Sequence, residues 1–247
     1  MHKIPVTAVI LAGGLGKRIG GDKGLQLLHG RVLLSWVLNA VCRDSQIVFI
    51  NANDAQGAYA NFGCRVIADL IPDWPGPLAG LHAALSSADT EYVLTVPCDT
   101  PFLPNDLPGR LLAGLTGQGV EAAVAMAGGR RQPAIALYHK RVLPKLVDYL
   151  ASGGRKVNDW LNSLRLSEVA FDNVADFENI NTQDELNRAN RMPVPARCTI
   201  EPGFSISARS EGDQEVEDVK TAGTGNSIMN TQKIIGFAGF SGSGKTT

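Results

Sequence analysis

The chain has 247 residues, of which 44% are hydrophobic, and a formal net charge of -1. This length and composition can bury the core of an α/β domain with a further segment attached, and they exclude an intrinsically disordered chain. The near-zero charge provides no overall field towards nucleic acid or an anionic membrane, so we expect neither as a partner and expect local clusters to hold any anionic ligand.

Cysteine usage and the N-terminal pattern indicate the compartment. The four cysteines are widely spaced, without a CxxC pair or the density of a disulfide scaffold, which favours a reducing environment. The first apolar run is short and breaks into glycines, unlike a secretory leader, and no stretch approaches the length of a membrane span. We therefore expect a cytoplasmic protein.

The first half of the chain alternates between strand and helix patterns. Residues 6–12 form a short apolar run that ends in glycines, which predicts a buried first strand. The elements expected after it are a helix at 32–41, a strand at 46–51, a connecting segment at 55–62, a strand at 64–68, a helix at 78–87 and a strand at 92–96.

The second half continues in the same manner. Its expected elements are segments at 103–115, 122–126, 134–138 and 142–150, followed by a last helix at 182–191. The alternation predicts an α/β fold, with a parallel sheet covered by helices on both faces. In such sheets ligands bind beyond the carboxyl ends of the strands, so the candidate site residues should follow strands.

The composition changes after residue 192. Residues 193–231 are rich in Pro, Gly, Ser and Thr, which predicts a flexible linker and a folded domain over residues 1–192. Residues 232–247 then run from a strand pattern into a full Walker A match, Gly239 to Thr246. Because a phosphate-binding loop needs the helix that follows it, we expect this segment to be the truncated start of a P-loop domain.

A glycine-rich loop, LAGGLGKR, directly follows the first predicted strand. Glycines such as Gly13 and Gly14 would let backbone N–H groups wrap a triphosphate, while Lys17 and Arg18 supply positive charge. The loop lacks the GK[ST] ending of a Walker A motif, and its basic pair stands where a dinucleotide fingerprint needs small residues. A purely structural strand-to-helix turn is the alternative.

Three charged residues outside that loop are further candidates. Lys23 offers a compact ammonium for a phosphate oxygen, with a solvated surface lysine as the alternative. Asp99 follows the strand at 92–96, where a bridging Mg²⁺ could reach its carboxylate, or else it caps the next helix. Asp69 follows another strand and either binds a ribose hydroxyl or base N–H, or is an ordinary loop residue.

Five motifs, in this order, resemble those of molybdenum cofactor guanylyltransferases: LAGGLGKRIGGDKG, the acid Asp69, PGPLAG, PCDTPFL and NINT. The resemblance covers residues 4–192. It implies a Rossmann-like, three-layer nucleotidyltransferase fold with a mostly parallel sheet and helices on both faces. It also implies Mg²⁺-dependent transfer of GMP from GTP to a molybdopterin phosphate, with release of pyrophosphate.

The resemblance also assigns residues to roles and implies partners. Catalysis is assigned to Arg18, Lys23 and Asp99, with Asp99 as the metal ligand. GTP contacts are assigned to Leu11, Ala12, Gly13, Gly14, Lys23, Asn51, Asp69 and Asp99. Molybdopterin contacts are assigned to Gly76, Gly80, Asn179 and Asn181, although a rigid turn at 75–80 and helix capping by the asparagines are the structural alternatives. Proteins that deliver the molybdenum cofactor or mature molybdoenzymes are implied partners.

Two basic loops and two other functions stay open. Residues 128–131 and 153–156 set basic side chains beside glycines, which suits either a pterin phosphate or a solvated surface loop. The first rival function is a molybdopterin cytidylyltransferase or a sugar-phosphate nucleotidyltransferase. The second is a P-loop GTP-binding regulator or adaptor in which residues 1–192 only deliver a partner.

Overall fold

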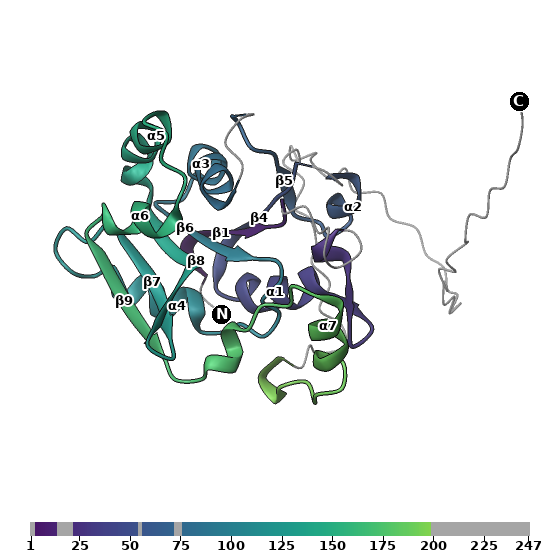
Figure 1. The fold of residues 1–247 in the computed structure, drawn as a ribbon. Helices are drawn as coiled ribbons and strands as arrows, with labels where there is room; N and C mark the ends of the chain where they lie inside the picture. Colours follow the sequence, from purple (N-terminus) through teal and green to yellow (C-terminus); the bar gives the residue numbers. More distant parts are fainter. Residues whose placement is uncertain (1–2, 14–21, 54–55, 72–75, 199–247) are drawn as a thin grey trace, which may run out of the picture. The chain divides into compact units, whose positions relative to one another are not determined.

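The computed structural model describes residues 3–13, 22–53, 56–71 and 76–198. Within these residues the main sheet has seven strands in the order β5-β4-β1-β6-β8-β7-β9 (Figure 1). Its strands are β1 (Ile4–Leu11), β4 (Ser45–Asn51), β5 (Arg65–Ile67), β6 (Tyr92–Pro97), β7 (Ala122–Ala127), β8 (Arg130–His139) and β9 (Leu166–Phe171), and a separate hairpin joins β2 (Leu27–Leu28) to β3 (Arg31–Val32).

The sheet is mostly parallel, as the resemblance implied, but one strand runs the other way. β8 is antiparallel to both of its neighbours, β6 and β7. The expectation that the second half continues the parallel alternation is therefore wrong. The reason is the two-residue loop Gly128-Gly129, where both residues have positive φ angles of 56° and 70°. Such a loop closes a tight hairpin, so the chain turns straight back from β7 into β8.

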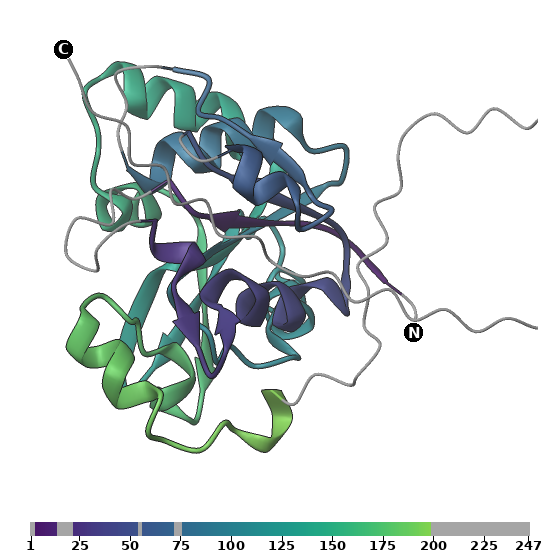
Figure 2. The same cartoon turned by 90° about the vertical axis from the view of Figure 1, so that its right-hand side faces the viewer.

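Helices cover both faces of the sheet, as predicted. Contacts with the strands place α1 and α4 against one face and α3 and α6 against the other, with α5 packed on α3 (Figures 1 and 2). The helices are α1 (Leu33–Cys42), α2 (Gln56–Ala60), α3 (Pro77–Ser87), α4 (Leu107–Gly114), α5 (Leu143–Ala151), α6 (Val157–Asn162) and α7 (Gln183–Ala189), with 3₁₀-helices η1 (Lys23–Leu25), η2 (Lys140–Val142), η3 (Val174–Phe177) and η4 (Ala196–Cys198).

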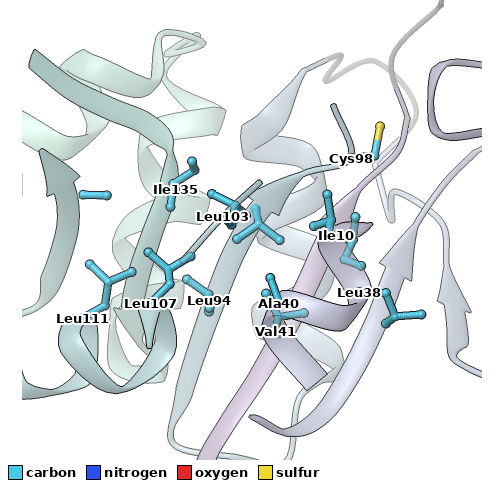
Figure 3. Close-up of a cluster of buried hydrophobic side chains, with 14 of the residues drawn as sticks. Ile10, Leu38, Ala40, Val41, Leu94, Cys98, Leu103, Leu107, Leu111 and Ile135 are labelled. Atoms are coloured by element: carbon cyan, nitrogen blue, oxygen red, sulfur yellow. The ribbon is translucent and has the colours of Figure 1, made fainter. Parts of the chain in front are cut away.

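The alternation of side chains along β1 divides the apolar interior into two layers. Ala8 and Ile10 belong to the cluster shared with α1 and α4, and Val9, between them, belongs to the cluster under α3, α5 and α6. Figure 3 shows the first cluster, in which Ile10 lies near Leu38 from α1. Burial on both faces explains why β1 reads as a continuous apolar run.

Several elements differ from the expected ones. β9 and α6 were not predicted, because each has only six residues and most of β9 is partly or fully exposed. α4 begins at Leu107 rather than at residue 103, since Pro104 disfavours helical backbone just before it. None of the helices in the described part of the chain is long and apolar enough to cross a membrane.

The packed chain reaches beyond the boundary predicted at residue 192. Cys198 is buried in a small cluster with Leu28 and Trp36, and Arg197 pairs with Asp176. Residues up to 198 therefore form part of the packing of this domain. The rest of the expected linker and the P-loop segment at 232–247 lie outside the described residues.

Candidate active site

Three parallel strands end side by side and define the carboxyl edge of the sheet. Leu11 at the end of β1 is in register with Asn51 on β4 and with Pro97 on β6. The next residues continue the pairing, since the amide of Ala12 donates to Asn51 O at 2.8 Å and the amide of Cys98 donates to Leu11 O at 3.1 Å. The segments that carry the glycine loop and Asp99 thus start from adjacent positions.

Lys23 and Asp99 meet at this edge. Nζ of Lys23 lies 2.5 Å from Oδ2 of Asp99 and 2.7 Å from Oδ1 of Asn181. The pair is largely shielded, with 19% and 11% of the two side chains exposed, so its charges are less screened than those of a surface pair. Lys23 is thus not the solvated surface lysine of the alternative interpretation.

The segment of Asn179 and Asn181 supports the loop after β6. The amide of Ile180 donates to Asp99 O at 2.9 Å, and Thr100 Oγ1 donates to Asn179 Oδ1 at 2.7 Å. Ile180, between the two asparagines, is buried. Neither asparagine side chain caps α7, because Thr182 fills that role in a capping box.

Asp99 is suited to hold a divalent cation together with substrate oxygens. Its Oδ1 atom is buried and has no hydrogen-bond partner among the described residues, an arrangement that leaves one carboxylate oxygen for a ligand. Mg²⁺ commonly takes one or two protein carboxylates and completes its shell with phosphates and water. No cluster of three His, Cys, Asp or Glu side chains occurs in the described ranges, which fits such a shared site. The helix-capping alternative fails because α4 begins only at Leu107.

A second polar group forms beside the ends of β4 and β5. Asn51 Nδ2 donates to Asp69 Oδ1 at 3.0 Å, and Asn53 Nδ2 donates to Asp69 Oδ2 at 2.8 Å. The Asp69 amide in turn donates to Asn53 Oδ1 at 2.8 Å. Both carboxylate oxygens of Asp69 therefore accept hydrogen bonds from side-chain amides. This arrangement favours a binding role over that of an ordinary loop residue.

Sequence reasoning missed two neighbours of this group. Asn53 lies two residues after Asn51, and this spacing at the end of a strand was the available signal. His82 on α3 is buried, which lowers its pKa, while the Asp69 carboxylate opposes the shift. The helical position of His82 gave no sign of this proximity.

The two glycines assigned to molybdopterin lie on α3 and at its start. A Cβ atom on Gly80 would overlap Asn51 Oδ1 and lie 2.7 Å from Leu11 Cδ2, so this glycine lets the helix approach the end of β1 closely. Gly76 precedes the helix with a φ of 116°, and no side chain caps the helix there. Gly80 thus lies beside residues assigned to GTP, whereas Asn179 and Asn181 lie beside Lys23 and Asp99.

Part of the predicted site cannot be placed. Gly14, Lys17, Arg18 and Pro75 lie outside the described residues. Of the glycine loop, Gly13 is placed near the Asn51 and Asn53 side chains, each 3.9 Å from where its Cβ would be.

The two basic loops are occupied by structural interactions. Arg131 contacts Glu168 and Asn162, with both distances at 2.6 Å. Arg155 donates to the backbone oxygens of Leu150 and Gly154. These contacts favour a structural role for both side chains.

A cavity lies beside the two asparagines, Asn179 and Asn181. It has a volume of about 630 Å³ and is lined by Phe102, Phe177, Asn179, Asn181 and α7 residues, among others. Because Asn181 also contacts Lys23, this residue links the charged pair to the cavity. A ligand in the cavity could thus present one end to the charged pair.

The comparisons with known proteins agree with this arrangement. Residues 8–169 match the family model of the MobA-like NTP transferase domain, so the fold and the site are those of a nucleotidyltransferase. A molybdenum cofactor guanylyltransferase of Cupriavidus taiwanensis is 46% identical over 73% of this chain and 94% of its own length. One from Shewanella sp. is 38% identical over 75% of this chain and 95% of its own length. The chain belongs to the molybdenum cofactor guanylyltransferase family.

Solved structures show the same fold. The molybdopterin-guanine dinucleotide biosynthesis protein A of Archaeoglobus fulgidus superposes with a TM-score of 0.62 at 27% identity, covering 75% of this chain and 97% of that protein. A CMP:2-keto-3-deoxy-manno-octonic acid synthetase, solved with CTP, has a TM-score of 0.61 at 12% identity, covering 77% and 98% of the two chains. The second likeness concerns the fold alone.

Proposed function

We propose that this enzyme transfers GMP from GTP to the terminal phosphate of molybdopterin, releases pyrophosphate and requires Mg²⁺. The observation that carries the proposal is the pairing of Lys23 with Asp99 at the carboxyl edge of the sheet, where one Asp99 oxygen has no protein partner among the described residues. The names of the relatives supply the identity of both substrates.

The proposed reaction needs no covalent enzyme intermediate. An oxygen of the molybdopterin phosphate attacks the α-phosphorus of GTP in line, the bond to the bridging oxygen breaks, and pyrophosphate leaves on the opposite side. The attacking phosphate is already ionised, so no general base is required. Catalysis then rests on positioning and on balancing negative charge.

Lys23 and Asp99 have distinct tasks in this reaction. The Lys23 ammonium would interact with phosphate oxygens as their negative charge shifts towards the leaving group. The free Oδ1 of Asp99 would hold Mg²⁺, which when bound neutralises charge on the phosphates. Asn181 accepts a hydrogen bond from Lys23 and so orients the ammonium between the two sides of the site.

The two polar groups suggest how the substrates divide the site. The group of Asn51, Asn53 and Asp69, with Gly80 packed against it, suits the nucleoside of GTP, because its amides and carboxylate can pair with ribose hydroxyls or base N–H groups. The cavity beside Asn179 and Asn181 suits the pterin. This division assigns Gly80 to the GTP site, whereas the resemblance assigned it to the molybdopterin site.

Guanine is preferred to cytosine in this proposal. The names of relatives with 38–46% identity favour a guanylyltransferase, whereas the CTP-binding neighbour shares the fold at 12% identity. Assembly partners that deliver the cofactor or receive the product, and a cytoplasmic location for a chain with four free thiols, belong to the same proposal.

The Walker A sequence from Gly239 to Thr246 is a separate matter. We propose that it belongs to a phosphate-binding loop that takes no part in the transfer, because the described site residues all lie between Leu11 and Asn181. A P-loop adaptor function would rest on this segment.

The deciding experiment supplies GTP labelled at the α-phosphate, Mg²⁺ and molybdopterin to the full chain. It measures the labelled dinucleotide and, separately, the unlabelled pyrophosphate that are formed. Formation of both in equal amounts, dependent on Mg²⁺ and on molybdopterin, is the expected result. Labelled dinucleotide formed equally well from CTP would favour the cytidylyltransferase alternative. Absence of any dinucleotide would reject the proposal.

A further inference from the structure

A buried tyrosine lies directly behind the segment that carries Lys23. Tyr59 on α2 has no exposed surface, and its ring belongs to the cluster between the sheet and α1. Its hydroxyl donates a hydrogen bond to Oδ1 of Asp22, the residue before Lys23. The two partners are 37 positions apart in the chain, so this bond ties two separate segments together.

The residue after Lys23 also depends on this ring. A Cβ atom on Gly24 would lie 2.6 Å from the Tyr59 hydroxyl oxygen and 3.3 Å from the nearest ring carbons. No side chain fits there unless the ring moves. Asp22 and Gly24 are therefore both held against the same phenol, and Lys23 stands between them.

The protonation of the phenol is stable. Burial, together with the hydrogen bond to Asp22, raises the pKa of Tyr59 far above its usual value. The hydroxyl thus remains a donor at every pH at which the enzyme would work.

We propose that Tyr59 is a positioning residue for Lys23. By holding Asp22 and Gly24, the phenol fixes the short turn η1 so that the Lys23 ammonium reaches Asp99 and, in the complex, the phosphates. The inference rests on the proposed GMP transfer. It assigns roles to Tyr59, and to Asp22 and Gly24 on either side of Lys23, that the resemblance did not assign.

The test replaces Tyr59 by Phe, which keeps the ring and removes only the hydroxyl. We expect a melting temperature close to that of the wild type and a kcat lowered by roughly 10-fold, less than the 10²-fold that a 1 Å misplacement can cost. The matched control is Tyr149→Phe, since Tyr149 on α5 also donates one hydrogen bond, to Lys156 O at 3.1 Å, away from the site. This control should leave kcat unchanged.

Two further variants separate positioning from general stability. Asp22→Ala should lower kcat as Tyr59→Phe does, and the double variant should be no worse than either single variant, because both remove one shared bond. Asp22→Asn keeps an oxygen acceptor for the phenol and should restore most of the activity. If Tyr59→Phe fails to fold, the two Asp22 variants still decide the question.

A readout without catalysis makes the result independent of the proposed function. The rate at which an amine-acylating reagent modifies Lys23, measured by peptide mass spectrometry, should rise severalfold in Tyr59→Phe and stay unchanged in Tyr149→Phe. A wild-type chain that makes no dinucleotide would reject GMP transfer, while the labelling rates would still test positioning. Equal Lys23 labelling in both variants, with equal kcat where transfer occurs, would overturn the inference.

Discussion

Lys23 and Asp99 are 76 positions apart in the chain, yet Nζ of the lysine lies 2.5 Å from Oδ2 of the aspartate. The contact joins the segment after the glycine loop to the segment after β6, and it depends on the parallel register of β1 and β6. Oδ2 of Asp99 is thereby used by Lys23, while its Oδ1 has no hydrogen-bond partner in the described part of the chain.

The substitution Asp99→Asn keeps the shape of this side chain and removes its charge. If Asp99 holds Mg²⁺ on the phosphates, we expect kcat to fall on the order of 10²-fold or more, with a smaller loss of GTP affinity. The fold should survive, because the carboxylate lies at a loop and not within a strand. Turnover measured against Mg²⁺ concentration checks this, and an Asn variant with wild-type turnover and metal dependence would remove Asp99 from the site.

Gly80→Ala should impair GTP binding. The added methyl group would overlap the Asn51 amide oxygen and crowd Leu11, and overpacking of this kind typically costs about 1–3 kcal/mol. We expect the KM for GTP to rise about 10-fold or more, since Asn51 orients Asp69. Gly109→Ala on α4 is the matched control, because its Cβ would meet nothing within 4 Å. A GTP KM that is the same in both variants would contradict the placement of the nucleoside.

The choice of base gives a prediction that tests the identity of the substrate. A site whose polar groups pair with guanine leaves them unpaired when cytosine binds, so we expect a clear preference in kcat/KM for GTP over CTP. The measurement is competition between the two nucleotides at subsaturating concentrations. Equal turnover of both would defeat the guanylyltransferase assignment.

Glu121 should contribute to stability in a pH-dependent manner. Burial by itself raises the pKa of Glu121, but hydrogen bonds from the Arg165 amide and the Lys145 ammonium outweigh it and leave the pKa below its usual value of 4.5. Because the pKa of Glu121 is lower in the folded chain than in the unfolded chain, its ionised carboxylate stabilises the fold fully at pH values above 4.5. This contribution is lost as the pH falls through the pKa of the folded state.

Glu121→Gln should therefore lower the free energy of unfolding by about 1–3 kcal/mol near neutral pH, with a smaller difference in acid. Denaturant titrations of both proteins across this pH range measure the effect. GMP transfer at pH 7 should be unchanged, because Glu121 precedes β7 at the end of the sheet opposite to Asp99. A difference in stability that grows on acidification would have the wrong sign for this account.

The Walker A lysine provides a prediction about the C-terminal segment. Lys245→Ala should leave the rate of GMP transfer unchanged, since the described site residues come from the part of the chain before Met192. The assay is the same labelled-GTP reaction on the full chain. A clear loss of activity would give the segment a role in the transfer.

Structural features that depend on residues close together in the chain could be predicted from the sequence. Contacts between segments that are far apart in the chain could not. The apolar run of β6 followed by an acid was enough to place Asp99 at a strand end, because the parallel register brings such ends together. The hairpin at Gly128-Gly129 was predictable, because two glycines stand between two apolar runs. Because arginines follow these glycines, the segment was interpreted as a candidate anion-binding loop instead. Tyr59 gave no signal, since its partner lies in another segment.

The last described residues of the chain are fastened to the loop that follows β6. Arg197 donates to Phe102 O at 3.1 Å, and Asn105 Nδ2 donates to Arg197 O at 2.9 Å, so η4 is fastened to the same loop that begins with Asp99. The last described residues therefore pack against the loop after β6 as well as near α7, so a change at Arg197 would disturb the backbone that follows Asp99.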